Sequence, residues 1–338
     1  MQRSLQDISD ITVIGGGPTG LYAAFYAGMR EMSVRIIDSL PELGGQLMAL
    51  YPEKYIYDVG GFPKVLARDL GQELVTQALQ FDPQVILNEE VSDFDRDGDL
   101  IVLRGNRGQF LTRTLLLAGG KGAFEPIKLK CPGYEELLGK GVHFAITDQG
   151  AFRGKRVLLV GGGDSAVDWA LALKDVASEL LLIHRRGAFR ALERSVARLQ
   201  VASEAGELSV RDHHEVREIG GSGRVESVVI FDNRSGEESS LQVDAVLTFL
   251  GFKPDLGPLK RWGLDLEGNR VVVDHLMRTN LPAVFAVGDM VDYEGKLDLI
   301  ATGFSEAAVA VSQAVRLVDP KARVNPGHST NMKIFKDS

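Results

Sequence analysis

The sequence is poor in cysteine and has no long apolar segment. Its 338 residues include one cysteine, Cys131, so an internal disulfide, a Cys-x-x-Cys redox pair and a cysteine-rich metal site are excluded. No apolar run approaches the roughly 20 residues of a membrane-spanning helix. The polar start "MQRSLQDISD" does not resemble a signal peptide. We therefore expect a protein of the reducing cytoplasm.

Positive charge is also scarce. The chain has 38 Lys and Arg against 46 Asp and Glu, and this net charge of −8 argues against general binding to nucleic acid or to an anionic membrane. The 44% hydrophobic content is typical of a globular protein. A chain of this length suits two ordinary domains or one large one. Its six histidines form no ligand-rich group, so we predict no metal site.

Two stretches, "ITVIGGGPTG" and "VLLVGGGDSA", repeat one pattern of apolar strand and glycine turn. In the first, the strand at 11–14 leads into Gly15, Gly17 and Gly20, then a helical stretch and a second strand that ends at Asp38. In this order of elements, glycines let a pyrophosphate approach the helix N-terminus and the carboxylate binds ribose hydroxyls. The first turn therefore predicts a dinucleotide site.

The second turn lacks the acidic residue at the end of its second strand. That strand is followed instead by His184, Arg185 and Arg186, and then by Arg190. Guanidinium groups bind a phosphate bidentately, whereas a carboxylate would repel it, so this site favours NADPH over NADH. FAD at the first turn and NADPH at the second is the economical pairing. The turn residues predicted to hold NADPH are Gly161, Gly163, Asp164, Ser165 and Ala166.

The other strands place the second dinucleotide unit inside the first. The stretch "VILNEEVSDFDRDGDLIVLRGNRGQFLTRTLLLAGG" predicts a β-meander that ends in a buried strand at 114–118, and "AVLTFLG" and "AVFAVGD" predict further buried strands. We expect an α/β fold of two Rossmann-like three-layer (ββα) domains. A discontinuous FAD domain covers 1–121 and 249–338, and an inserted NADPH domain covers 122–248.

The stretches "AGGKGAFEP", "TFLGFKPD" and "VFAVGD" resemble the two-dinucleotide-binding flavoprotein reductases along essentially the whole chain. The motifs "VGGGDSA" and "HRRGAFRA" are similar to those of low-molecular-weight thioredoxin reductases. One departure is decisive. Those enzymes carry a Cys-x-x-Cys before the second glycine strand, where "FAITDQGAF" has Ala145 and Asp148. Without that dithiol the usual route from flavin to a disulfide is missing, and we expect Cys131 to be inert.

Two further stretches, "GGQLMALYPEKYIYDVGGFP" and "NPGHSTNMKIF", resemble the thioredoxin-reductase-like ferredoxin–NADP reductases. The resemblance implies hydride transfer from NADPH to FAD, then single-electron transfer to ferredoxin or flavodoxin. It also implies a homodimer in which Tyr51 stacks on one flavin face and His328, from the C-terminal segment of the partner subunit, covers the other. Further FAD contacts are implied at Thr19, Gln46, Asp58, Val91, Phe124, Asp289 and Thr330.

Other functions stay open at this point. A disulfide reductase could use an external thiol, the chain could be a low-turnover sensor of FAD and NADPH, or oxygen could be the acceptor. Arg186, Arg190, Arg194 and Arg198 recur every four residues, and if helical the last three lie on one face. Such a face would suit an acidic electron carrier, although a solvated surface explains it equally well.

Overall fold

A computed structural model describes residues 8–122, 125–146, 148–253 and 255–335. Contacts divide the chain into two compact units, unit 1 (Met1–Phe124 with Pro254–Ser338) and unit 2 (Glu125–Lys253). Unit 2 is thus inserted into unit 1. Within the described residues, no helix is long and apolar enough to cross a membrane.

Unit 1 is built on a mixed seven-stranded sheet in the order β5-β2-β1-β8-β7-β6, with β21 also paired to β8. β8 is parallel to β1 over most of its length, and it pairs with β7 at its start and with β21 at its end. The antiparallel β6–β7–β8 meander and its buried last strand confirm the sequence prediction. The strands are β1 (Ile8–Ile14), β2 (Val34–Ile37), β5 (Gln84–Ile86), β6 (Val91–Asp97), β7 (Leu100–Gly105), β8 (Gln109–Leu117) and β21 (Val284–Ala286).

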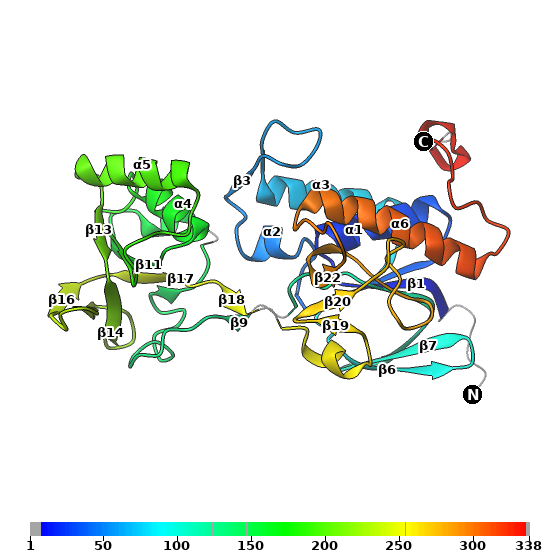
Figure 1. The fold of residues 1–338 in the computed structure, drawn as a ribbon, viewed down its shortest axis with the longest axis horizontal. Coiled ribbons are helices and arrows are strands. Elements are labelled where there is room, and N and C mark those ends of the chain that lie inside the picture. The colour runs from blue at the N-terminus through cyan, green and yellow to red at the C-terminus, as the bar shows by residue number, and fades with distance from the viewer. Residues whose placement is uncertain (1–7, 123–124, 147, 254, 336–338) are drawn as a thin grey trace. The chain divides into compact units, whose positions relative to one another are not determined.

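Helices cover one side of this sheet, and Figure 1 shows α1, α3 and α6 side by side above β1. α1 and α6 lie against each other, with the rings of Tyr22 and Phe304 4.8 Å apart, and both helices bury several small residues, among them Ala23 and Ala27 on α1 and Ala307 and Ala310 on α6. The helices are α1 (Pro18–Met29), α2 (Gln46–Ala49), α3 (Ala67–Ala78) and α6 (Ile300–Val318). The smaller strands of this unit are β3 (Tyr55–Ile56), β4 (Val65–Leu66), β19 (Leu266–Glu267), β20 (Arg270–Val272) and β22 (Val291–Asp292).

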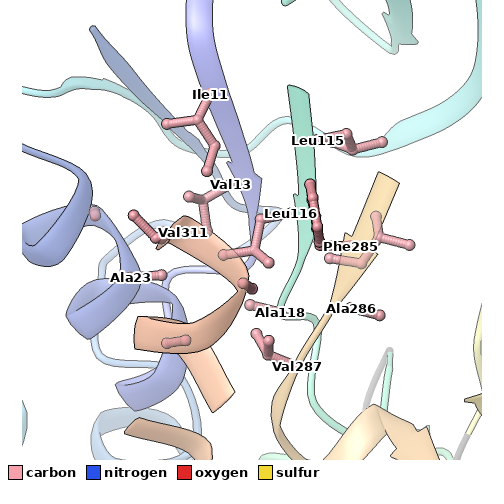
Figure 2. Close-up of a cluster of buried hydrophobic side chains, with 14 of the residues drawn as sticks. Ile11, Val13, Ala23, Leu115, Leu116, Ala118, Phe285, Ala286, Val287 and Val311 are labelled. Atoms are coloured by element: carbon pink, nitrogen blue, oxygen red, sulfur yellow. The ribbon is translucent and has the colours of Figure 1, made fainter. Parts of the chain in front are cut away.

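The core of unit 1 lies between the sheet and these helices. Figure 2 shows Val13 of β1, Leu116 of β8 and Phe285 of β21 together with Ala23 and Val311 from the helices. The second halves of β1 and β8 are the most deeply buried parts of these strands, with Ile11, Val13 and the run at 115–117 all inaccessible to solvent, as is typical of strands inside a parallel sheet. The strand ends are thereby fixed at one edge of the sheet.

Unit 2 repeats the strand–turn–helix plan with a five-stranded parallel sheet in the order β10-β17-β11-β12-β13. A three-stranded antiparallel sheet, β14-β15-β16, adds a further layer. The elements of the parallel layer are β10 (Val142–His143), β11 (Arg156–Gly161), α4 (Asp164–Leu173), β12 (Glu179–His184), α5 (Glu193–Glu204), β13 (Ser209–Asp212) and β17 (Ala245–Phe249). The antiparallel sheet comprises β14 (His214–Gly220), β15 (Ser227–Asp232) and β16 (Glu238–Gln242).

The two chain segments that connect the units pair with each other. β9 (Glu125–Pro126) is antiparallel to β18 (Phe252–Lys253). Because both strands group with unit 2, the contacts divide the chain a few residues later at each crossing than the boundaries at 121 and 249 expected from sequence.

The expected helical face of arginines is only partly formed. α5 begins at Glu193, so Arg194 and Arg198 lie on the helix while Arg186 and Arg190 lie in the loop before it. The expectation that Arg190 shares a helix face with the later two is wrong, because the backbone of this loop is directed to the second glycine turn: Arg190 donates its N–H to the Gly162 carbonyl at 2.7 Å.

Replacing Phe285 by alanine should destabilise unit 1. The side chain is 2% exposed in the middle of the core, so Phe285→Ala should lower the free energy of unfolding by about 3–5 kcal/mol. Urea denaturation of the apoprotein measures this. Val272→Ala, on neighbouring β20 with 38% exposure, is the matched control and should change stability by less than about 1 kcal/mol. Equal losses in the two variants would contradict the proposed core.

Candidate cofactor sites

A cleft opens in unit 1 where the parallel strands β1 and β8 end. Its cavity volume is about 410 Å³, and its walls come from the first glycine turn, the segment after β8 and the start of α6. Ligand sites in open α/β sheets form at this edge of the sheet. The structure brings the following predicted FAD residues together on its walls: Gly15, Gly17, Thr19, Asp38, Gln46, Tyr51, Val91 and Asp289.

The first glycine turn is tight at one end and open at the other. Gly15 has a positive φ of +109°, and a Cβ there would lie 2.4 Å from the Ala118 carbonyl oxygen. A Cβ on Gly20 would lie 1.9 Å from the Gly15 carbonyl oxygen, so that glycine lets α1 pack on the turn. Gly17 has free space around it. It is the N-cap residue of α1, and no side chain accepts a hydrogen bond from the first turn of that helix. Unpaired amides at this position suit a phosphate group.

Asp38 stands at the end of β2 and is 8% exposed. Its carboxylate accepts the Gly16 N–H at 2.5 Å and the Leu40 N–H at 2.8 Å. Burial raises the pKa of Asp38 above its ordinary value of 3.8, and these two hydrogen bonds oppose the rise. A carboxylate has about four acceptor positions, so two amides leave capacity for hydroxyl groups.

Tyr51 and Asp289 line the cleft as well. Burial raises the pKa of Tyr51 to about 12, helped by the negative charges of Asp289 and Asp58. Burial also raises the pKa of Asp289, and the Lys121 ammonium, 4.0 Å from its carboxylate, opposes this. Asp58 thus acts on Tyr51 through its charge but does not line the cleft. The phenol of Tyr51 remains protonated near neutral pH.

The C-terminal residues expected to cover a flavin lie outside the cleft of their own chain. His328 and Thr330 are both exposed. The segment before them is attached to α1, because the Arg30 guanidinium donates to the carbonyl oxygens of Arg323 and Val324. Phe124, the other predicted contact, lies outside the described residues.

The second glycine turn packs like the first, although Gly161 is the last residue of β11 and lacks the positive φ of Gly15. A Cβ on Gly161 would lie 2.6 Å from the Phe249 carbonyl oxygen, just as a Cβ on Gly15 would lie close to the Ala118 carbonyl oxygen. Gly163 has open space around it. It is the N-cap residue of α4, and no side chain caps this helix start. Ala166 is fully buried in the place of Gly20. Each turn therefore packs its first glycine, Gly15 or Gly161, against the end of a neighbouring parallel strand and leaves Gly17 or Gly163 open.

The loop after β12 is fastened onto this turn. Asp164 accepts the Leu192 N–H at 2.9 Å. His184 is 7% exposed, its Nε2 lies 3.2 Å from the Ala188 carbonyl oxygen, and its ring packs against Gly162. Burial lowers the pKa of His184, and three nearby arginines lower it further. The ring therefore supports the loop from inside as a neutral imidazole.

The three arginines of this loop are exposed to solvent and form a cluster of positive charge. Arg185, Arg186 and Arg190 are all exposed, and their positive charges act together on His184. A second cavity of about 580 Å³ lies nearby, between the loop at 187–191 and α5. None of the predicted NADPH residues lines it, although the loop that carries Arg190 forms one of its walls.

Sequence reasoning missed several parts of the first cleft. Glu89 and the segment at 257–259 line it, and so do Leu299 and Ile300 at the start of α6. Only the position of "AGG" directly after a buried strand could have indicated the wall at Gly119 and Gly120. The others come from loops whose paths the sequence pattern does not determine.

The described residues hold no group of three or more His, Cys, Asp and Glu side chains that could bind a metal ion. Burial raises the pKa of the Cys131 thiol to about 11, and the charges of Glu136 and Glu218 add to the rise, as expected for an inert thiol. At the position of the missing dithiol, the Asp148 carboxylate accepts the Gly150 N–H at 2.8 Å.

Comparison with known proteins supports this architecture. The model of the pyridine nucleotide-disulphide oxidoreductase family matches residues 9–314. A ferredoxin–NADP reductase of Thermus thermophilus is 50% identical over 325 residues, which are 96% of this chain and 97% of the relative. One of Sulfurisphaera tokodaii is 50% identical over 333 residues, 97% of this chain and 98% of the relative.

Solved structures of thioredoxin reductases share the fold. That of Lactococcus lactis superposes with a TM-score of 0.77 at 27% identity, and covers 92% of this chain and 99% of its own. That of T. acidophilum has a TM-score of 0.78 at 24% identity, over 94% of this chain and 100% of its own.

Fold and sites together define a flavin- and NADP-dependent oxidoreductase with two dinucleotide-binding units, which confirms the fold class expected from sequence. The chain belongs to the pyridine nucleotide-disulphide oxidoreductase family, and within it to the group of its ferredoxin–NADP reductase relatives.

The charge of Asp38 should make the stability of the apoprotein depend on pH. Because the folded pKa lies above 3.8, the folded chain keeps a proton that the unfolded chain loses, so the contribution of Asp38 to stability falls as the pH rises through the folded pKa. Asp38→Asn removes this dependence. The melting temperature of the variant minus that of the wild type should therefore increase from about pH 4 upward. A pH-independent difference, like that expected for the exposed control Asp99→Asn, would contradict the burial of the charge.

Proposed function

We propose that the chain is a ferredoxin–NADP reductase that binds FAD in unit 1 and NADPH in unit 2. The observation that carries this proposal is a pair of similar glycine turns that carry side chains of opposite charge at the position expected for the ribose. Asp38 stands beside the first turn, and the loop that carries the exposed Arg185, Arg186 and Arg190 is hydrogen-bonded to the second turn. A carboxylate suits an unmodified ribose, whereas arginines suit a ribose that carries a phosphate.

The cleft of unit 1 fits an extended dinucleotide. The open Gly17 and the uncapped start of α1 would receive the pyrophosphate, and Asp38 the ribose of the adenosine. At the other end, Asp289 would accept hydroxyls of the ribityl chain and Tyr51 would cover one flavin face. The remaining contacts that we propose are Gly15, Thr19, Gly20, Gln46, Asp58, Val91 and Phe124.

In unit 2 the open Gly163 and the start of α4 would receive the NADPH pyrophosphate, with Gly161, Asp164, Ser165 and Ala166 forming the turn. The arginine loop would bind the 2′-phosphate, and His184 would hold that loop in place.

The bound flavin supplies the conversion of a two-electron donor to one-electron steps. The chain binds and orients the two cofactors and supplies no nucleophile. Ala145 and Asp148 at the dithiol position remove the usual route from flavin to a disulfide, which favours a one-electron carrier such as ferredoxin or flavodoxin as the acceptor. We further propose a homodimer, because His328 and Thr330 are exposed beyond their own cleft and would reach the flavin of the partner subunit.

The arginine loop should determine the choice of NADPH over NADH. Arg185→Ala with Arg186→Ala should raise the KM for NADPH about ten- to a hundredfold, because two charge-assisted contacts to phosphate are lost. The KM for NADH should stay nearly constant, and steady-state kinetics with both nucleotides measures this. Arg224→Ala is the control, because the Arg224 side chain lies in the same unit and is 81% exposed. This variant should leave the KM for NADPH and the KM for NADH unchanged. An equal rise for both nucleotides would contradict the assignment.

Reduction of cytochrome c by NADPH should be several-fold faster when ferredoxin is added to the FAD-loaded protein. If ferredoxin has no effect while NADPH still bleaches the flavin, the proposed acceptor is wrong. If an added dithiol protein is reduced instead, the disulfide-reductase alternative is correct. A flavin that NADPH does not bleach would favour the low-turnover sensor.

A further inference from the structure

α6 carries a charged residue inside the core of unit 1. Glu306 is 3% exposed, and its carboxylate accepts three hydrogen bonds. The Gly288 N–H donates to Oε2 at 2.6 Å, the Tyr293 hydroxyl donates to Oε1 at 2.8 Å, and the Lys296 ammonium donates to Oε1 at 2.6 Å. The Lys296 side chain is itself only 4% exposed. Both charges are thus paired away from solvent.

Stability alone does not account for this pair. Two charges removed from water regain little net free energy from each other, and apolar residues of similar size often serve a fold equally well. The contact partners suggest another role. All three donors come from the chain between the end of β21 and the start of α6, and one of them, Gly288, directly precedes Asp289 on the wall of the cleft.

The turn at Gly288–Met290 has little freedom on its other side. Gly288 has a positive φ of +79°, and a Cβ there would lie 3.2 Å from the Thr19 hydroxyl oxygen. A Cβ on Gly303 of α6 would lie 2.3 Å from the same oxygen. α1, the turn and α6 therefore meet around Thr19, and the bond from Gly288 to Glu306 ties the turn to α6 at this point.

Among the described residues, no side chain lies close enough to Asp289 to hold its carboxylate by a hydrogen bond. Lys121 lies 4.0 Å away, which is too far for a hydrogen bond, and it also lies 3.8 Å from Asp298. Asp298 is in turn bound by Arg270 at 2.7 Å. The position of Asp289 in the cleft thus depends on its backbone, and the backbone is held through Gly288.

We propose that Glu306, neutralised by Lys296, is a positioning residue that holds the Gly288–Asp289 turn so that the Asp289 carboxylate meets the hydroxyl-bearing chain of the flavin dinucleotide. The proposal rests on the FAD site proposed above and adds a residue that does not touch the cofactor. Glu306 acts through the backbone of the turn, and Lys296 keeps its charge compatible with burial.

Two double variants distinguish the role of Glu306 as hydrogen-bond acceptor for the Gly288 N–H from its role in the ion pair with Lys296. Glu306→Gln with Lys296→Met removes both charges but keeps an oxygen for the Gly288 N–H, whereas Glu306→Leu with Lys296→Met also removes that oxygen. Neither leaves a single buried charge. FAD is titrated into each apoprotein, followed by quenching of flavin fluorescence. We expect the leucine variant to bind FAD at least about tenfold more weakly than the glutamine variant, because a buried donor loses its partner.

A coupling measurement tests whether the effect passes through Asp289. Asp289→Asn is introduced into the wild type and into both double variants. If Glu306 positions Asp289, the tenfold difference should shrink to about twofold or less in the Asp289→Asn background, because interacting residues are not additive. The visible circular dichroism of the bound flavin should change in the leucine variant but not in the glutamine variant. A second apolar pair, Glu306→Met with Lys296→Leu, replaces the leucine variant if that chain does not fold.

Equal FAD affinity in the two double variants would overturn the positioning role, and so would a tenfold difference that persists in full without the Asp289 carboxylate. In the first case the pair serves the fold only, and the apoprotein melting temperatures should fall without a change in FAD affinity. In the second case Glu306 affects FAD binding by a route that does not pass through Asp289. A wild-type chain that does not bind FAD would instead refute the proposed function. The two failures are therefore distinguishable.

Discussion

The contact on which both sites depend is the one between the first glycine of each turn and the end of a neighbouring parallel strand. Gly15 lies against the Ala118 carbonyl and Gly161 against the Phe249 carbonyl, in both cases too close for a side chain. This contact holds the turn beside the carboxyl ends of two strands, and it directs the helix that follows. The open positions Gly17 and Gly163, and the helix starts without a side-chain cap that follow them, are consequences of that placement.

The two units use this plan for different chemistry through the few residues at the end of the second strand. In unit 1 the buried carboxylate of Asp38 accepts hydrogen bonds from two backbone amides and can still accept further ones. In unit 2 a buried imidazole, His184, supports a loop whose arginines face solvent. In the proposed sites, selectivity would come from the side chains placed after the strand, whereas both turns pack their first glycine against a neighbouring strand.

Much of this could be predicted from sequence, because it follows local rules. The glycine turns, Asp38, the arginine loop and the β-meander are all encoded in short segments with a clear period or spacing. Arg190 was expected on a helix face because spacing alone does not show that its amide binds Gly162. Glu306 and Lys296 could not be found at all. A glutamate in a helix and a lysine in a loop ordinarily lie at the surface, and only the tertiary arrangement shows that they pair in the core.

The surroundings of Cys131 bear on how the protein withstands oxidants. Because burial raises the pKa of this thiol to about 11, it stays protonated at neutral pH, and the thiolate is the species that reacts with peroxide. No second cysteine exists in the chain to form an intramolecular disulfide with it. Enzymes that pass electrons through a surface dithiol expose that pair to peroxide and alkylating agents. A chain with Ala145 and Asp148 in its place has no such target, so its turnover should persist under oxidative stress that would silence a dithiol enzyme.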